Sequence, residues 1–207
     1  MQKPFHYDPG NILGEIPDLK NKRLLDVGAG LACSYCLSYI YHTDKDQKKI
    51  KTFGDLNEYV KAKNLNAIAF DKGFAKTTFK IMPEISVCGD ARSLPFKDEN
   101  FDIVTMGYLL DYFIKDKPGL EKVMEETSRV LKPKGYLAGH VLLHPSLIGE
   151  AARIIKSPFY LPKYIEQKKI YMEAMENNNL KPLKSNIRLY DDTDTTNFTL
   201  FFINQKV

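Results

Sequence analysis

The chain of 207 residues is predicted to be an α/β protein with a mainly parallel sheet covered by helices on both faces. Short apolar runs alternate with helical patterns along most of its length. The first apolar run leads into a glycine turn and then a helix. Near the end of the chain, two β-rich runs follow each other without a helix between them, which predicts an antiparallel hairpin.

Apolar periodicity and start and stop signals define each expected element. Bounded apolar runs predict strands at 24–27, 67–70, 85–88, 101–106, 136–143, 187–190 and 197–203. Helical spacing predicts helices at 31–41, 55–63, 74–79, 120–131, 146–155 and 163–177. The helix at 120–131 is expected to stop at Lys132-Pro133-Lys134-Gly135, with the glycine near its C-terminal cap.

We expect one domain over residues 1–207, because the chain suits a single α/β core and shows no internal repeat. Three segments depart from the alternation. Residues 1–22 are expected to form an N-terminal cap segment, and the polar residues 42–57 an insertion. Residues 145–178 are expected to form a lid and a helix on the substrate side. Ordinary packing of a connecting loop is the alternative for the lid.

Composition argues against several classes of protein. Apolar residues make up 43% of the chain without a run of about 18, so no transmembrane helix is expected. No apolar stretch of signal-peptide type is present, which favours a cytoplasmic location. Three cysteines argue against a disulfide framework, and the pair Cys33 and Cys36 fits helix packing better than a redox or metal site. The net charge of +4 is dispersed, so no nucleic acid partner is expected. No second CxxC or nearby histidine completes a zinc ligand set, so no metal is expected.

The turn after the first strand carries the strongest functional signal. Gly28 and Gly30 let the backbone turn sharply and approach a ligand closely. The following helix start offers unpaired N–H groups and a partial positive charge, which suits an anionic or nucleotide-like cofactor. A dinucleotide site would have a third glycine where Cys33 stands, and an acid about 20 residues on, much nearer than Asp71. The sequence therefore gives little support to a nicotinamide cofactor.

Five segments in order resemble landmarks of the class I S-adenosylmethionine-dependent methyltransferases, most closely the small-molecule, type 11-like members. They are 26–32 (DVGAGLA), 69–71 (AFD), 89–96 (GDARSLPF), 98–104 (DENFDIV) and 126–135 (ETSRVLKPKG). The resemblance implies that family's Rossmann-like fold, a mostly parallel seven-stranded sheet with an antiparallel last strand. It also implies S-adenosyl-L-methionine as cofactor and S-adenosyl-L-homocysteine as product.

For the methionine end of the cofactor, the resemblance implies contacts along the first and fourth strands. The backbone of Gly28, Ala29 and Gly30 would meet the methionine part, and Asp26 would lie near its ammonium group. Two further residues would end the fourth strand near the sulfonium: Met106 and Gly107.

For the adenosine end, the resemblance implies acidic residues at the ends of the second and third strands. Asp71 would accept hydrogen bonds from both ribose hydroxyls, a role that suits a carboxylate because it only accepts. Asp90 would accept from the adenine amino group, while the Ala91 N–H pairs with a ring nitrogen. Lys72 and Leu94 would flank the ring.

Methyl transfer depends mainly on proximity and alignment, so the sequence is not expected to carry a universal catalytic motif. Candidate catalytic residues are His144, His140 and Tyr108, which lie near the ends of the fourth and fifth strands. A histidine there could act as a general base near neutral pH. A histidine bonded to backbone, or an exposed one, is the alternative. Tyr112 and Asp111 are further candidates on the substrate side.

The sequence therefore predicts an enzyme that moves a methyl group from S-adenosylmethionine to a small-molecule acceptor, acting as a monomer or homodimer. Two alternatives stay open. One is a methyltransferase of RNA or protein, which normally brings a recognition domain or a large basic face. The other is a methyltransferase-like binding protein without turnover, against which the intact glycine turn argues.

Overall fold

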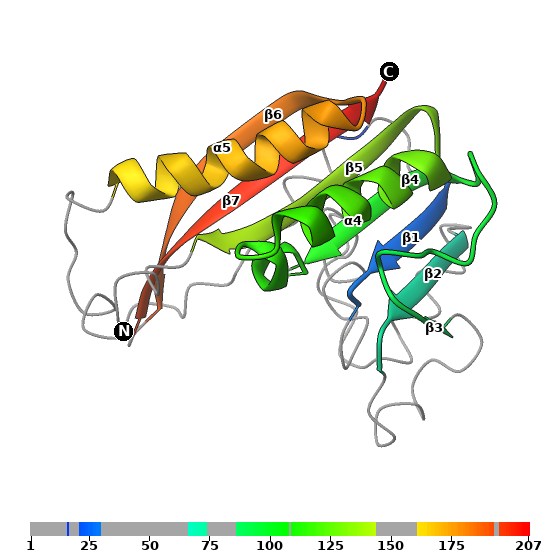
Figure 1. Cartoon of the computed structure of the whole chain (residues 1–207), viewed down its shortest axis with the longest axis horizontal. Helices are drawn as coiled ribbons and strands as arrows, with labels where there is room; N and C mark the ends of the chain where they lie inside the picture. Colours follow the sequence, from blue (N-terminus) through cyan, green and yellow to red (C-terminus); the bar gives the residue numbers. More distant parts are fainter. Residues whose placement is uncertain are drawn as a thin grey trace, which may run out of the picture.

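A computed structural model of the chain describes residues 16, 21–29, 66–73, 86–107, 109–143, 161–192 and 195–207. These residues form a seven-stranded sheet of order β3-β2-β1-β4-β5-β7-β6 (Figure 1). Pairing is parallel from β3 across to β5, whereas β7 runs antiparallel to both of its neighbours, β5 and β6. The strands are β1 (Arg23–Val27), β2 (Asn66–Asp71), β3 (Ser86–Cys88), β4 (Phe101–Gly107), β5 (Leu131–Leu143), β6 (Leu180–Asp192) and β7 (Thr195–Lys206).

The sheet confirms the predicted strands and the antiparallel closing hairpin. Three helices are described: the 3-10 helix η1 (Leu110–Phe113), α4 (Lys117–Val130) and α5 (Leu161–Asn177). The last two confirm the helices predicted at 120–131 and 163–177. The helices predicted at 31–41, 55–63, 74–79 and 146–155 lie outside the described residues, as do the insertion at 42–57 and the Cys33–Cys36 pair.

One face of the sheet packs against α4 and α5, which lie side by side in front of it in Figure 1. Side chains of a strand alternate between the two faces, so every second residue reaches this core. The core includes Val123 and Met124 of α4 and Tyr171 and Met175 of α5. The strand residues packed against them include Leu25, Val27, Val104, Met106, Leu137, Val141, Leu200 and Phe202.

The helix α4 starts and ends differently from the sequence prediction. It begins earlier because the Asp116 carboxylate accepts a hydrogen bond from the Gly119 N–H at 3.0 Å and caps the first turn. It ends at Val130 with Leu131 already extended, so Gly135 is not its cap. Instead, Gly135 lies within β5, where a Cβ would approach the Lys132 carbonyl oxygen to 2.8 Å. A close backbone approach accounts for this glycine.

The strand order indicates which edge of the sheet is suited to bind a ligand. The chain leaves β1 toward β2 on one side, and β4 pairs with β1 on the other side, so the order reverses between β1 and β4. Open α/β sheets bind ligands at such a switch point, beyond the carboxyl ends of the strands. Among the described residues, no helix is long and apolar enough to cross a bilayer.

Candidate cofactor and active site

A cavity of about 630 Å³ opens at the carboxyl ends of β1, β2, β3 and β4. Its size lies in the range usual for small-molecule sites. Six residues predicted for the site line it together: Gly28, Asp71, Lys72, Asp90, Ala91 and Gly107. The sheet thus brings together residues that are up to 79 positions apart in the sequence.

The turn after β1 is fixed by backbone contacts to β2. Gly28 adopts φ +75°, a left-handed conformation that favours glycine. The N–H groups of Gly28 and Ala29 both donate to the Phe70 carbonyl, at 2.8 and 3.1 Å. These two donors are therefore engaged within the protein, although Gly28 still lines the cavity. Ala29 is buried, and Gly30 lies outside the described residues.

Asp26 lies below this turn, buried in the sheet. The Thr105 hydroxyl of β4 donates to Asp26 Oδ1 at 2.9 Å, and the two residues are register partners. Met106, next to Thr105, is also buried and belongs to the core on the opposite face. Neither Asp26 nor Met106 is among the residues that line the cavity, whereas Gly107, one step further along β4, is.

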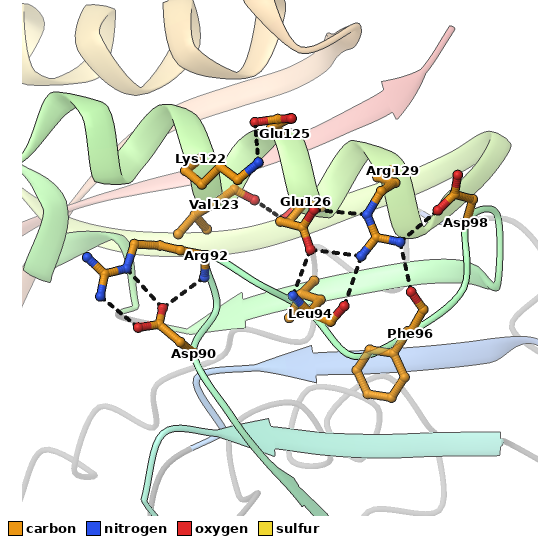
Figure 2. Close-up of polar contacts among 11 residues, drawn as sticks. Asp90, Arg92, Leu94, Phe96, Asp98, Lys122, Val123, Glu125, Glu126 and Arg129 are labelled. Carbon is orange, nitrogen blue, oxygen red and sulfur yellow. Dashed lines mark hydrogen bonds and ion pairs between the residues drawn. The ribbon is translucent and has the colours of Figure 1, made fainter.

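The two predicted acidic ligands stand at the ends of neighbouring strands. Asp71 ends β2, and one of its carboxylate oxygens accepts from the Gly73 N–H at 3.1 Å. Asp90 follows β3, and its carboxylate accepts two hydrogen bonds from the Arg92 guanidinium (Figure 2). Those bonds, with one from the Arg92 N–H, hold the pKa of Asp90 well below its usual range. Asp90 is therefore an ionised acceptor at neutral pH.

A partly buried ion pair of α4 fixes the segment between β3 and β4. Glu126 and Arg129 are joined by two hydrogen bonds of 2.9 and 2.8 Å. Glu126 accepts from the Leu94 N–H at 2.7 Å, and Arg129 donates to the carbonyls of Leu94 and Phe96 at 2.9 and 2.7 Å (Figure 2). Arg129 also pairs with Asp98 at 2.7 Å. Leu94, expected to flank the adenine, is instead buried in the core.

The remaining lining residues were not predicted for the cofactor site. Phe70 lies beside Gly89, where an added Cβ would come within 2.7 Å of the phenyl ring. Leu109, Tyr112 and Phe113 form an apolar wall after β4. Tyr112 was considered only for the substrate side, and its side chain is 83% exposed. The other wall residues belong to a short 3-10 turn or its approach, whose spacing carries no distinctive sequence signal.

Among the candidate catalytic residues, the structure describes one. Tyr108 and His144 lie outside the described residues. His140 on β5 pairs in register with Gly107, and its ring lies 5.9 Å from that of Phe201 on β7. It is fully buried in the sheet and is not among the residues that line the cavity. Burial lowers the pKa of His140 to about 3.

We expect the His140 imidazole to stay neutral between pH 5 and 8, because the sheet interior disfavours its charged form. Its chemical shift, followed by NMR with a His140→Gln variant for assignment, should show no titration in this range. Stability should fall as the pH drops below about 6.5, since the unfolded chain then binds a proton that the folded chain does not. An inflection of the His140 signal near pH 6.5 would contradict this assignment.

Fold and cavity define a class of protein: an α/β domain that holds a nucleotide-like cofactor at its strand ends. A family model described as a methyltransferase domain matches residues 25–139, more than half of the chain. The chain belongs to the class I S-adenosylmethionine-dependent methyltransferases. The predicted family, fold and cofactor are thereby confirmed.

Solved structures of similar fold include two bacterial or archaeal methyltransferases. A SAM-dependent methyltransferase from Methanosarcina mazei superposes with a TM-score of 0.59 and 15% identity, covering 92% of this chain and 94% of that one. A putative methyltransferase from Bacillus halodurans has a TM-score of 0.59 and 16% identity, covering 96% and 98%. At these identities the likeness concerns the fold.

Curated relatives match over shorter stretches. A ubiquinone/menaquinone biosynthesis C-methyltransferase from Rickettsia felis is 30% identical over 122 residues, 58% of this chain and 44% of that protein. A demethylmenaquinone methyltransferase from Lactobacillus johnsonii is 47% identical over 47 residues, 23% of this chain and 18% of that protein. The matches therefore span less than half the length of these relatives.

Proposed function

We propose that this chain transfers a methyl group from S-adenosylmethionine to a small-molecule acceptor by in-line displacement. The observation that carries the proposal is the shared cavity of Gly28, Asp71, Asp90 and Gly107. The cofactor's ribose hydroxyls and adenine amino group are hydrogen-bond donors, and the two carboxylates at the strand ends are acceptors of the matching kind. These residues therefore fit the cofactor that the family uses.

Four residues that line the cavity have specific roles in this proposal. Asp71 binds the ribose, Asp90 and the Ala91 N–H bind the adenine, and Gly28 leaves room for the methionine part. When bound, the cofactor supplies an electrophilic methyl group on a positively charged sulfur. The protein would align an acceptor nucleophile with this methyl group in the cavity that Gly107 lines, which lowers the entropic cost of the reaction.

The apolar wall of the cavity favours a methyl acceptor that has a large apolar part. Leu109, Tyr112 and Phe113 continue the cavity beyond Gly107 and offer carbon surface rather than charge. Relatives named for quinone and sterol methylation agree with this choice. His140, His144 and Tyr108 stay predictions for a general base, which is needed only if the acceptor arrives protonated.

The first test is binding. Calorimetry should show that S-adenosyl-L-homocysteine binds, and Asp71→Asn should weaken binding by at least about 1 kcal/mol because a ribose donor loses its charged acceptor. Glu173→Gln on the exposed side of α5 is a matched control that should leave the affinity unchanged. No binding by the unmodified chain would refute the proposal, and an unchanged affinity in Asp71→Asn would remove Asp71 from the site.

The second test concerns the acceptor. The chain is incubated with methyl-labelled S-adenosylmethionine and with separate small-molecule, RNA and protein fractions of a cell extract. We expect label in the small-molecule fraction alone. Label in RNA or in protein would overturn the proposed acceptor class while leaving the cofactor assignment in place.

A further inference from the structure

Arg92 has no role in the function described so far, yet it lines the cofactor cavity. Its side chain is directed at Asp90: Nε donates to Oδ1 at 3.0 Å and Nη2 donates to Oδ2 at 2.6 Å (Figure 2). The backbone N–H of Arg92 donates to Oδ1 at 2.9 Å as well. Within the described residues, every hydrogen bond of the Arg92 side chain goes to Asp90. Arg92 is thus dedicated to the carboxylate proposed to recognise adenine.

These hydrogen bonds leave the Asp90 carboxylate few positions at which it can accept a further hydrogen bond. An ionised carboxylate has about four acceptor positions, two on each oxygen. Oδ1 already accepts two hydrogen bonds and Oδ2 accepts one. One position therefore remains, on Oδ2, and it matches the single N–H that an exocyclic amino group can present to one acceptor. The parallel bonds from a planar guanidinium also fix the plane of the carboxylate.

We propose that Arg92 is a positioning residue that makes Asp90 selective for a 6-amino purine. It holds the carboxylate ionised, in one orientation, with one acceptor position open. A 6-oxo purine places a carbonyl oxygen against this acceptor and an N–H against the Ala91 N–H, so both contacts become repulsive. Without the Arg92 side chain, the Asp90 carboxylate keeps only the hydrogen bond from the backbone N–H of residue 92. Rotation about the terminal side-chain torsion of Asp90 then has a broad energy minimum. Fixing it on binding then costs conformational freedom.

The inference rests on the proposed function and is tested by a ratio of affinities. Calorimetry measures S-adenosyl-L-homocysteine against S-inosyl-L-homocysteine, the same molecule with a 6-oxo base. We expect the unmodified chain to prefer the adenine compound by at least about tenfold, because the wrong base leaves site groups unpaired. Arg92→Ala should reduce this preference about threefold or more, Arg92→Lys less, and Asp90→Asn should abolish it.

The possible outcomes distinguish a failure of this inference from a failure of the proposed function. Failure of the unmodified chain to bind either compound would overturn the proposed function. Equal binding of both compounds would overturn the role of Asp90, and the inference with it. A full preference in Arg92→Ala, or tighter binding of both compounds, would overturn the inference alone. Lys169→Ala, which removes an exposed cation paired with Glu173 on α5, is the matched control and should keep the preference.

Arg92→Ala should remain folded, so a change in the ratio is not a consequence of unfolding. The side chains of Arg92 and Asp90 are 45% and 35% exposed, and ion pairs with this exposure contribute little to stability. The thermal midpoint of the unliganded variant should match that of the unmodified chain. Because a purely structural role would weaken both compounds equally, the ratio is the deciding readout.

Discussion

Gly28→Ala should abolish detectable binding of S-adenosyl-L-homocysteine and destabilise the fold. Residue 28 has φ +75°, where an L-residue costs roughly 1–2 kcal/mol. A Cβ at this position would also lie 2.8 Å from Cβ of Leu109, which lines the same cavity. The added Cβ and the Leu109 side chain cannot both occupy these positions, so the turn after β1 must move relative to the apolar wall of the cavity. Calorimetry measures the lost affinity, and urea unfolding the lost stability.

Gly73→Ala is the matched control, since an added Cβ there meets none of the described residues within 4 Å and φ is not positive. We expect it to bind as the unmodified chain does. A second variant separates the two causes at Gly28: in Gly28→Ala combined with Leu109→Gly, the contact with Cβ of residue 109 is relieved while the backbone strain remains. Binding should return in part. Normal affinity in Gly28→Ala alone would show that the turn tolerates a side chain and that this argument is wrong.

The positions of the strands could be predicted from the sequence because each buried parallel strand is a short apolar run with a clear end. The roles expected for Asp71 and Asp90 came from the resemblance to the family, and their places after two strands agree with it because parallel strands bring their ends to one edge. Asp102, near the start of β4, has a structural role, since its carboxylate accepts from the Arg23 N–H at 2.9 Å and from Lys132 at 3.0 Å. The local sequence pattern was sufficient to predict a strand wherever burial on both faces of the sheet requires a continuous apolar run.

Features that depend on exposed or distant groups could not be predicted. The hairpin strand β6 extends over Leu180–Asp192, far beyond the predicted 187–190, because it is an edge strand. After the buried Leu180, residues 181–184 are exposed and include Lys181, Pro182 and Lys184, which protect an edge from further pairing but are not typical of a strand. Likewise, the Arg92 contact and the Leu109 wall depend on side-chain geometry that apolar spacing does not encode.

Arg129→Met should destabilise the protein by about 2 kcal/mol, the loss expected when a charged donor to a buried carboxylate is removed from a pair whose cation is 30% exposed. The Glu126 side chain is only 10% exposed, and Arg129 is its cation. The substitution also removes the hydrogen bonds to the carbonyls of Leu94 and Phe96, so the segment that carries Asp90 keeps the bond from the Leu94 N–H to Glu126 but loses these two contacts with α4. Urea unfolding should report the loss of stability, and weaker binding of S-adenosyl-L-homocysteine should accompany it.

A matched control lies on the same helix. Lys122 and Glu125 form an ion pair with the same i,i+3 spacing, but their side chains are 47% and 59% exposed (Figure 2). Lys122→Met should therefore cost no more than about 1 kcal/mol. The double variant Glu126→Gln with Arg129→Met removes the stranded charge and should recover part of the stability. Equal losses in Arg129→Met and Lys122→Met would show that the buried pair contributes nothing beyond an exposed one.

The effect of Arg129→Met should also depend on pH. In the unmodified chain, hydrogen bonds from Arg129 lower the pKa of Glu126 below its ordinary value of 4.5. The stability from this shift is present above pH 4.5 and is lost as the pH falls through the folded pKa. Without Arg129, the hydrogen bond that lowers the pKa of Glu126 most is lost, so this pKa rises relative to that in the unmodified chain, and protonation on acidification relieves the variant. The stability gap between the two proteins should therefore narrow between pH 7 and pH 4, whereas a gap independent of pH would mean that lost packing, not a stranded carboxylate, causes the destabilisation.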